Sequence, residues 1–341
     1  MLQTKLTKDY GLDFPFVSAG MGFVALPELA AAVSNAGGLG LLGVAPAPPA
    51  GMLAMIQATR SRTSRRFGVD LIITDTAFGP ATTDEHIDIC IREGIDVVVF
   101  FWNFPSKEWI NKLHRTGAKV WIQIGSLDYA TQAVEMGADA VIIQGSEAGG
   151  HNHSTAGLFS LLPTIIDAVA PVPVIAAGGI ADGRGVAAAL ALGADGVCVG
   201  TRLVASAEAY AHAEYKNRIV AAEVADVTRT HLFGPEWPDQ PMKVIRNRVV
   251  SEWTGRDTKT PPSPNPPQSI GSTLLSGQEY LLPKFSAIPP TPDTSGDFEE
   301  MCLAAGESAG LVKEIKPAAT IIKEMMDEAA DIIRRLSALP R

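Results

Sequence analysis

The 341-residue sequence predicts an α/β protein, a TIM (β/α)8 barrel with an appended helical subdomain. Three observations favour this fold class. The chain is 46% hydrophobic but only 6% aromatic, and it contains 32 glycines, which suits tightly packed α/β layers. Short apolar runs alternate with amphipathic stretches, as in a parallel sheet covered by helices. About eight such units fit in the first 205 residues, which favours a closed barrel over an open doubly wound sheet.

A repeated junction supports the count of units. Four times, a glycine ends an amphipathic stretch and a short loop leads into an apolar run, as expected for a helix C-cap followed by a buried strand. The four glycines and the runs after them are Gly94 before VVVFFW, Gly117 before VWIQIG, Gly137 before AVIIQG and Gly193 before GVCVG.

The remaining strands are expected at residues 16–19, 39–44, 67–74 and 173–179. The second of them contains Gly38, Gly40 and Gly43 at GxGxxG spacing. These glycines lie within the strand, and prolines rather than a helix follow them. We therefore reject a Rossmann dinucleotide site at this position.

The rhythm of strands and helices ends near Ser206, which defines three regions. Residues 1–205 form the predicted barrel. Residues 206–308 form the helical subdomain, with helices expected at 208–224 and 244–253 and proline-rich connections at 261–267 and 283–296. Residues 309–341 contain an amphipathic helix that should pack back on the barrel.

Charge and cysteine content exclude several classes of protein. The formal net charge of −9 disfavours binding to nucleic acid or to an anionic membrane surface. The three cysteines lie far apart, which argues against a disulfide framework or a zinc site and fits a reducing compartment. The N-terminus lacks the apolar core of a signal peptide, and no long apolar run is present. We expect a cytoplasmic protein.

In a barrel, the loops that follow the strands share one rim, where function gathers. After the sixth strand, QGSEAGGHNHS carries a glycine pair and His151, a side chain that exchanges protons near neutral pH. A histidine that merely bonds its loop neighbours is the alternative. Strands seven and eight end in Gly178-Gly179 and Gly200-Thr201, and a helix should begin at Asp182. These features predict an anion site for a phosphate, although such glycines also occur in simple turns.

The other rim residues are weakly polar, which favours a flat conjugated ring as the ligand. Met21, Trp102 and Phe104 would provide apolar contact, and Gln123 and Gln144 would bond ring edges. For Met21 and Trp102, packing in the core is an equal alternative. A metal held by His151 and His153 is not expected, because the rim offers only Asp70 and Asp75 as carboxylates.

Four further segments are informative when they are read together: QGSEAGGH (144–151), VIAAGGIADGRG (174–185), GADGVCVGTRLVAS (193–206) and SAGMG (18–22). In this combination they resemble the nitronate monooxygenase family, formerly called 2-nitropropane dioxygenases. Flavin-dependent enoyl-acyl-carrier-protein reductases and some NAD(P)H:quinone reductases share this framework.

The resemblance implies an FMN cofactor and His151 as the catalytic base. Two positions depart from the family pattern. Asp70 stands where the family usually has asparagine, and Asn152-His153 follows His151 where the family commonly reads Arg-Gly. The FMN-binding residues implied are Ala19, Gly20, Met21, Gly22, Asp70, Gln123, Gln144, Ala148, Gly149, Gly178, Gly179, Cys198, Val199, Gly200 and Thr201.

The function that follows is FMN-dependent oxidation of alkyl nitronates and nitroalkanes by O2. A neutral nitroalkane must first lose its α-proton, a task matched to a neutral imidazole. The alternatives are an NAD(P)H-dependent flavin reductase acting on quinones or enoyl thioesters, and a flavin-binding barrel without turnover. The sequence leaves NAD(P)H as a reductant and a homo-oligomer open.

Overall fold

The computed structural model describes residues 2–76, 79–262, 264–266, 268–275 and 277–339. Its central element is a sheet of eight parallel strands in the order β1-β11-β10-β8-β7-β6-β3-β2. A parallel bridge between Val17 and Leu39 joins the two edges, so that the sheet is a nearly closed barrel, as predicted. The strands are β1 (Phe16–Ser18), β2 (Gly40–Gly43), β3 (Phe67–Ile72), β6 (Val97–Phe101), β7 (Lys119–Ile124), β8 (Ala140–Gln144), β10 (Val174–Ala177) and β11 (Gly196–Val199).

The barrel interior is filled by apolar side chains, with Trp121 as the largest. Its indole Nε1 donates a hydrogen bond of 2.8 Å to the hydroxyl oxygen of Tyr10, at the end of helix α1 (Lys5–Tyr10). Leu6 of the same helix lies against Gly196, the first residue of β11. Helix α1 therefore covers the amino ends of the strands and leaves their carboxyl ends for function.

Seven helices cover the outside of the barrel between successive strands. Several begin where the sequence supplies a cap, such as Ser126, whose side chain accepts from Tyr129 N, and one ends at Gly137 with φ 104°. The helices are α2 (Pro27–Asn35), α3 (Pro49–Arg60), α4 (Asp84–Arg92), α5 (Lys107–His114), α6 (Leu127–Met136), α7 (Leu158–Val169) and α8 (Gly183–Ala191).

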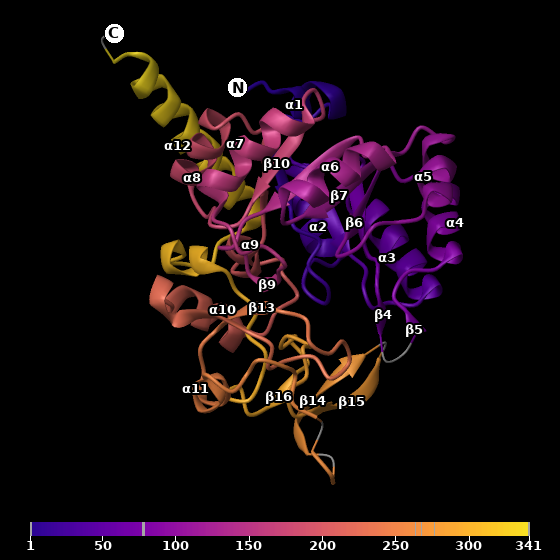
Figure 1. The fold of residues 1–341 in the computed structure, drawn as a ribbon, viewed down its shortest axis with the longest axis vertical. Helices are drawn as coiled ribbons and strands as arrows, with labels where there is room; N and C mark the ends of the chain where they lie inside the picture. The colour runs from indigo at the N-terminus through magenta and orange to yellow at the C-terminus, as the bar shows by residue number, and fades with distance from the viewer. Residues whose placement is uncertain (1, 77–78, 263, 267, 276, 340–341) are drawn as a thin grey trace.

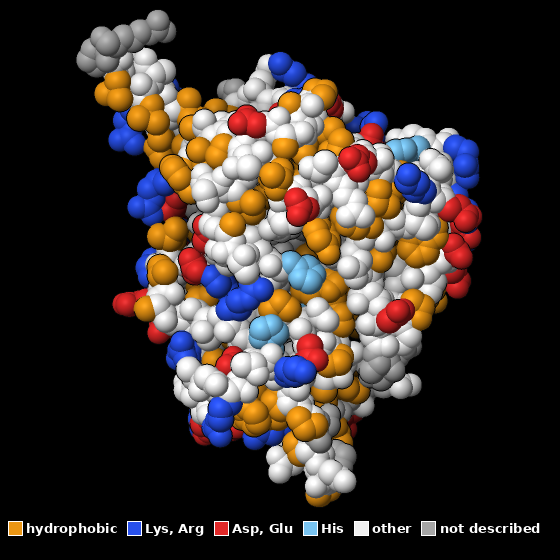
Figure 2. Space-filling model, viewed as in Figure 1, with side chains coloured by type: hydrophobic (Ala, Val, Ile, Leu, Met, Phe, Trp, Pro, Cys, Tyr) orange, Lys and Arg blue, Asp and Glu red, His pale blue; other side chains and the backbone are white. Residues whose placement is uncertain are grey.

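The eighth helix of the ring comes from the end of the chain. Only the four-residue helix α9 (Thr201–Val204) follows β11, whereas α12 (Ala318–Ser337) packs against α8 and α2. The expectation of eight complete units within residues 1–205 is corrected accordingly. The last turns of α12 project beyond the barrel (Figures 1 and 2). Among the described residues, no helix combines the length and apolar character needed to cross a bilayer.

The region between the barrel and α12, called the appended region below, contains both strands and helices. This corrects the expectation of a helical subdomain. Residues 242–245 form a strand, and the expected helix begins only at Arg248, because strand pairing overrides the local pattern. Positions 263 and 267 of the proline-rich connection lie outside the described residues. The elements are α10 (Ala213–Ala221), η1 (Val224–Asp226), β12 (Val227–Thr230), β13 (Met242–Ile245), α11 (Arg248–Trp253), β14 (Ser269–Leu275), β15 (Gln278–Pro283), β16 (Ser295–Gly296) and η2 (Glu307–Leu311).

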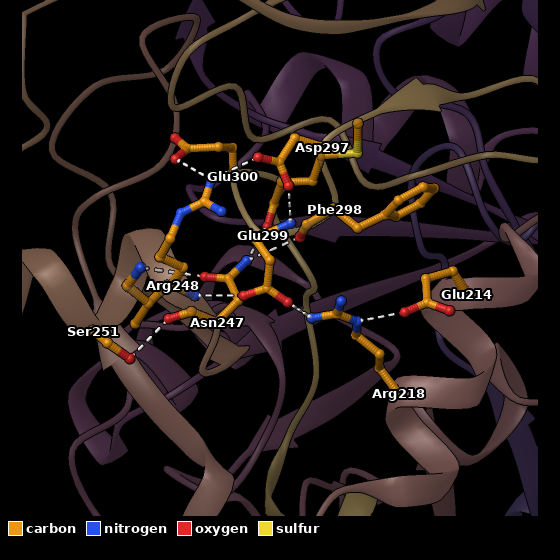
Figure 3. A network of polar contacts seen from close by, with 11 residues as sticks. Glu214, Arg218, Asn247, Arg248, Ser251, Asp297, Phe298, Glu299 and Glu300 are labelled. Carbon is orange, nitrogen blue, oxygen red and sulfur yellow. Dashed lines mark hydrogen bonds and ion pairs between the residues drawn. The ribbon is translucent and has the colours of Figure 1, made fainter.

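A polar network fastens residues 297–301 to helices α10 and α11 (Figure 3). Arg248 donates to Asp297 at 2.6 Å and to Glu300 at 2.8 Å. Arg218 of α10 donates to Glu299, which also accepts from Arg248 N. The buried Asn247 caps α11 and donates to two carbonyl oxygens of residues 298 and 301. Specific polar contacts thus position a segment that has no regular structure of its own.

Candidate functional site

A cavity of about 770 Å³ lies at the carboxyl ends of the barrel strands, between the rim and the appended region. Every residue predicted as a cofactor ligand contributes to its wall except Val199. Val199 is buried behind the wall, and its carbonyl oxygen accepts from Ala19 N at 3.0 Å. His151, predicted as the base, also lines the cavity. The structure therefore brings together residues that are widely separated in the chain.

The ends of β10 and β11 form one side of the cavity. Gly178 and Gly179 have φ of 105° and 72°, values that residues with a side chain adopt at a cost. Gly200 and Thr201 lie on the same wall, and Thr201 begins the short helix α9. A short extra helix after the eighth strand is a common phosphate site in barrels. These backbone groups are the candidates for binding an anion.

The start of α8, also predicted as part of the anion site, is already occupied. The Asp182 carboxylate accepts from Arg184 N at 3.0 Å and from Gly185 N at 3.2 Å. Glu328 of α12 accepts from Gly183 N at 2.8 Å. Because two carboxylates already bind these amides, this part of the prediction is wrong.

The glycine pair before His151 serves two different purposes. A Cβ atom on Gly149 would lie 2.3 Å from Gly306 N, so the close approach of another chain segment requires glycine there. Gly150 has φ of 66°, and a Cβ atom on it would meet nothing within 4 Å. The pair thus lets the loop cross beneath residues 305–306 and turn toward the cavity.

His151 is held by backbone contacts and by aromatic rings. Strand β9 (Gly150–His151) pairs with β13, and Gln144 Nε2 donates to the carbonyl oxygen of His151 at 3.2 Å. The centroid of its ring lies 4.4 Å from that of Trp237 and 5.7 Å from that of Trp102. The His151 Nε2 atom is buried and has no hydrogen-bond partner among the described residues. Burial, and then the neighbouring His153, lower the pKa of His151 to about 4, so the imidazole is neutral at pH 7.

Trp237 is the functional candidate that the sequence analysis missed. It lies in the loop between β12 and β13, in a region for which the sequence analysis named no site residue. Trp102 has φ of 86° and stacks on His153 with 3.5 Å between ring centroids, so it supports the histidine loop without lining the cavity. Phe104 stacks on Tyr129 and is also absent from the cavity wall, contrary to its predicted ligand contact.

Asp70 is a second buried polar group in the cavity wall that has an unpartnered atom. It lies on β3 with 5% of its surface exposed, and its Oδ1 atom has no hydrogen-bond partner in the described part of the chain. A Cβ atom on Gly20 would lie 2.2 Å from Asp70 Cβ, which explains the glycine at that position. Burial raises the pKa of the Asp70 carboxyl well above its usual range.

The rest of the wall is mainly apolar and comes from loops and from the appended region. Pro46, Pro80, Leu275, Tyr280 and Ile288 are among its members. No lysine or arginine is found among the described lining residues. The sequence carried no signal for these residues, because their place on the wall depends on how distant segments pack.

Within the described ranges, no group of three or more His, Cys, Asp or Glu side chains could hold a metal ion. Asp75, one of the two rim carboxylates considered, is exposed on strand β4 (Asp75–Thr76) and pairs with β5 (Gly79–Pro80). The expectation that no metal is bound stays a prediction.

Comparison with known proteins gives the family. The family model described as nitronate monooxygenase matches residues 3–328. A *Mycobacterium tuberculosis* relative, a (3aS,4S,5R,7aS)-5-hydroxy-7a-methyl-1-oxo-octahydro-1H-indene-4-carboxyl-CoA dehydrogenase, is 32% identical over 99% of both chains. A *Rhodococcus jostii* relative of the same description is 42% identical over 67% of this chain, but the match spans only 62% of that relative.

Solved structures agree with this assignment. FabK from *Thermotoga maritima* is 33% identical, with a TM-score of 0.80 over 99% of both chains. Nitroalkane oxidase from *Streptomyces ansochromogenes* is 27% identical, with a TM-score of 0.79 over 97% of this chain and 99% of the other. The barrel and the cavity agree with the family match, which covers nearly the whole chain. The chain therefore belongs to the nitronate monooxygenase family of flavin-dependent oxidoreductases.

Proposed function

We propose that the protein binds FMN and oxidises nitroalkanes and alkyl nitronates with O2, with His151 as the base that removes the α-proton. The observation that carries this proposal is the buried, unpartnered Nε2 atom of His151 on the wall of the cavity. A buried polar atom without a partner is costly, and a ligand that uses it accounts for its presence.

The residues around the cavity fit FMN. Gly178, Gly179, Gly200 and Thr201 would hold its phosphate through backbone N–H groups. Met21 and the neighbouring glycines of the first loop would lie against the ring. When bound, FMN supplies the redox chemistry by accepting electrons from the substrate and passing them to O2. The protein binds and orients the substrate and excludes water.

His151 would supply the proton transfer. With a pKa near 4 its imidazole is neutral, so Nε2 has a free lone pair at pH 7. On taking the α-proton it becomes an imidazolium beside the substrate anion. Because the described cavity wall has no lysine or arginine, this charge is the one that would stabilise the anion. A base of this kind contributes roughly 100- to 10,000-fold in rate.

Oxygen uptake by the purified FMN-loaded protein tests the base role. We expect His151→Ala to lose roughly 100- to 10,000-fold of the activity on a neutral nitroalkane and far less on a nitronate formed beforehand. His153→Ala is the matched control, because His153 lies in the same loop as His151 but does not line the cavity. Its ring stacks on Trp102 instead. Undiminished activity of His151→Ala on the neutral substrate would exclude the base role.

A second candidate is a flavin-dependent oxidoreductase of acyl thioesters. The observation that favours it is the description of the *Mycobacterium* and *Rhodococcus* relatives as dehydrogenases of a carboxyl-CoA compound. The apolar wall near Leu275 and Ile288 would suit a hydrophobic acyl group. Anaerobic titration with a nitroalkane, an acyl-CoA and NADH in separate cuvettes distinguishes the candidates, because the compound that bleaches the flavin is the reductant. Cytoplasmic location, use of NAD(P)H and a homo-oligomer stay predictions.

A further inference from the structure

The Asp70 carboxyl is buried where no described residue compensates for a charge. Asp70 lies in the middle of β3, opposite Gly43 of β2 and Val99 of β6. Its side chain is pressed against the backbone at Gly20 and borders the cavity. None of the hydrogen bonds or ion pairs between described residues involves this carboxyl, and its Oδ1 atom is buried and unpartnered.

The neighbours of Asp70 do not stabilise an anion. One titratable group that senses it is the Cys198 thiol, whose own pKa is raised by burial and then by Asp70. An unpaired carboxylate in such a place is strongly destabilising, and protonation removes the charge that causes the penalty. The remaining titratable side chains on the cavity wall are His86, His151, Tyr215, Glu236 and Tyr280.

Two of these groups are already engaged elsewhere. His86 Nδ1 lies 2.9 Å from Thr83 Oγ1, and its Nε2 lies 3.2 Å from the carbonyl oxygen of residue 47. The Glu236 carboxylate accepts from Ser286 Oγ at 2.7 Å. Neither group is therefore available to pair with Asp70.

We propose that Asp70 is a neutral carboxylic acid in the folded protein and donates its O–H to an acceptor atom of the bound flavin. The second half of this inference rests on the proposed FMN site. A protonated carboxyl carries one donor and one carbonyl acceptor, the same pair that a side-chain amide offers, whereas a carboxylate can only accept. Asp70 would thus serve as a positioning residue for the cofactor.

Infrared difference spectroscopy of the full-length protein at pH 7 tests both halves. We expect the carbonyl stretch of a protonated carboxylic acid in FMN-free wild type, its loss in Asp70→Asn, and its shift to lower frequency when FMN binds. Cys198→Ala is the matched control and should keep the band, because it removes only the neighbouring thiol.

FMN affinity gives an independent readout. Asp70→Asn retains a donor and should bind FMN within a few-fold of wild type, whereas Asp70→Ala should bind about tenfold more weakly, the effect of losing one hydrogen bond. Absence of the acid band in the wild type, or a band that FMN leaves unmoved in a yellow protein, would overturn the inference. A protein that takes up no FMN at all contradicts instead the cofactor proposal.

Discussion

The barrel and the appended region are stabilised in different ways. The barrel interior is almost wholly apolar, and its largest side chain, Trp121, makes one hydrogen bond, to Tyr10. The appended region has a smaller apolar cluster around Phe233 and depends on the polar network of Asn247 and Arg248. Burial of repeated apolar strands therefore suffices for the first region, whereas the second requires particular side chains at particular positions.

The candidate site draws on both regions. The barrel provides Asp70 and the glycines at the ends of β10 and β11. The appended region provides Trp237 and the strand β13, which pairs with His151. The cofactor would thus bind to the barrel, which we expect to resist unfolding more strongly. The position of the base would depend on the polar contacts of the appended region. The following predictions test this difference.

The largest effect should come from the barrel core. Trp121→Ala removes a fully buried side chain and should lower the free energy of unfolding by about 3–5 kcal/mol, measured by urea denaturation. Tyr10→Phe is the control, because it only leaves Nε1 of Trp121 without its partner, at a cost of about 1–3 kcal/mol. Equal losses in the two variants would show that the hydrogen bond, not apolar burial, dominates there.

The next effect concerns pH. The folded protein binds the proton of His151 only near pH 4, whereas an unfolded chain binds it near 6.5. Between these values the unfolded state holds more protons at position 151, whereas a neutral Asp70 carboxyl adds a term of the opposite sign. In the Asp70→Asn variant, which lacks that opposing term, stability should therefore fall as pH drops from 6.5 to 4, by about 3 kcal/mol at most. For the same reason, kcat/KM on a neutral nitroalkane should keep its value well below pH 6.5 and decline only near pH 4.

Trp237→Ala tests whether burial by the Trp237 ring is what lowers the pKa of His151. Removing the ring that lies 4.4 Å from His151 should admit water and move the acid limb of kcat/KM toward pH 6.5. Trp237→Phe should leave the limb near its wild-type position. An acid limb at pH 6.5 already in the wild type would contradict the description of His151 as a desolvated base.

A smaller loss of stability is expected from the polar network. Asn247→Ala removes the N-cap of α11 and leaves the carbonyl oxygens of Phe298 and Met301 without their donor, at a cost of about 1–3 kcal/mol. Thermal unfolding and hydrogen exchange of residues 297–301 measure it. Asn247→Asp keeps the cap but not the donor, so it should lie between the wild type and the alanine variant. Faster exchange in the barrel strands instead would contradict the division into two regions.

The smallest effect should come from an exposed pair on the barrel side. Lys323 pairs with Asp327 on α12, and both side chains are more than half exposed. Because water and salt screen such pairs, Lys323→Ala should leave the melting temperature unchanged. A clear decrease would mean that this helix face is covered by something other than solvent.

Much of the fold could be predicted because it depends on local patterns. Apolar strands, glycine caps and the distance between them repeat along the first 205 residues, and the barrel follows from them. The part of the cavity wall formed by the strand ends followed in turn, since these ends share one rim. The start of α8 was misjudged for a physical reason, because its amides bind Glu328, a side chain 145 residues further along the chain.

The sequence by itself determined the barrel and the set of rim residues, because periodic burial and glycine positions are local properties of a chain. Only the tertiary structure decided that α12 completes the ring, that residues 242–245 form a strand between β12 and β9, and that Trp237 packs on His151. Those contacts join segments far apart in sequence, and their energy comes from the match between two surfaces. Neither surface alone carries a pattern that reveals the other.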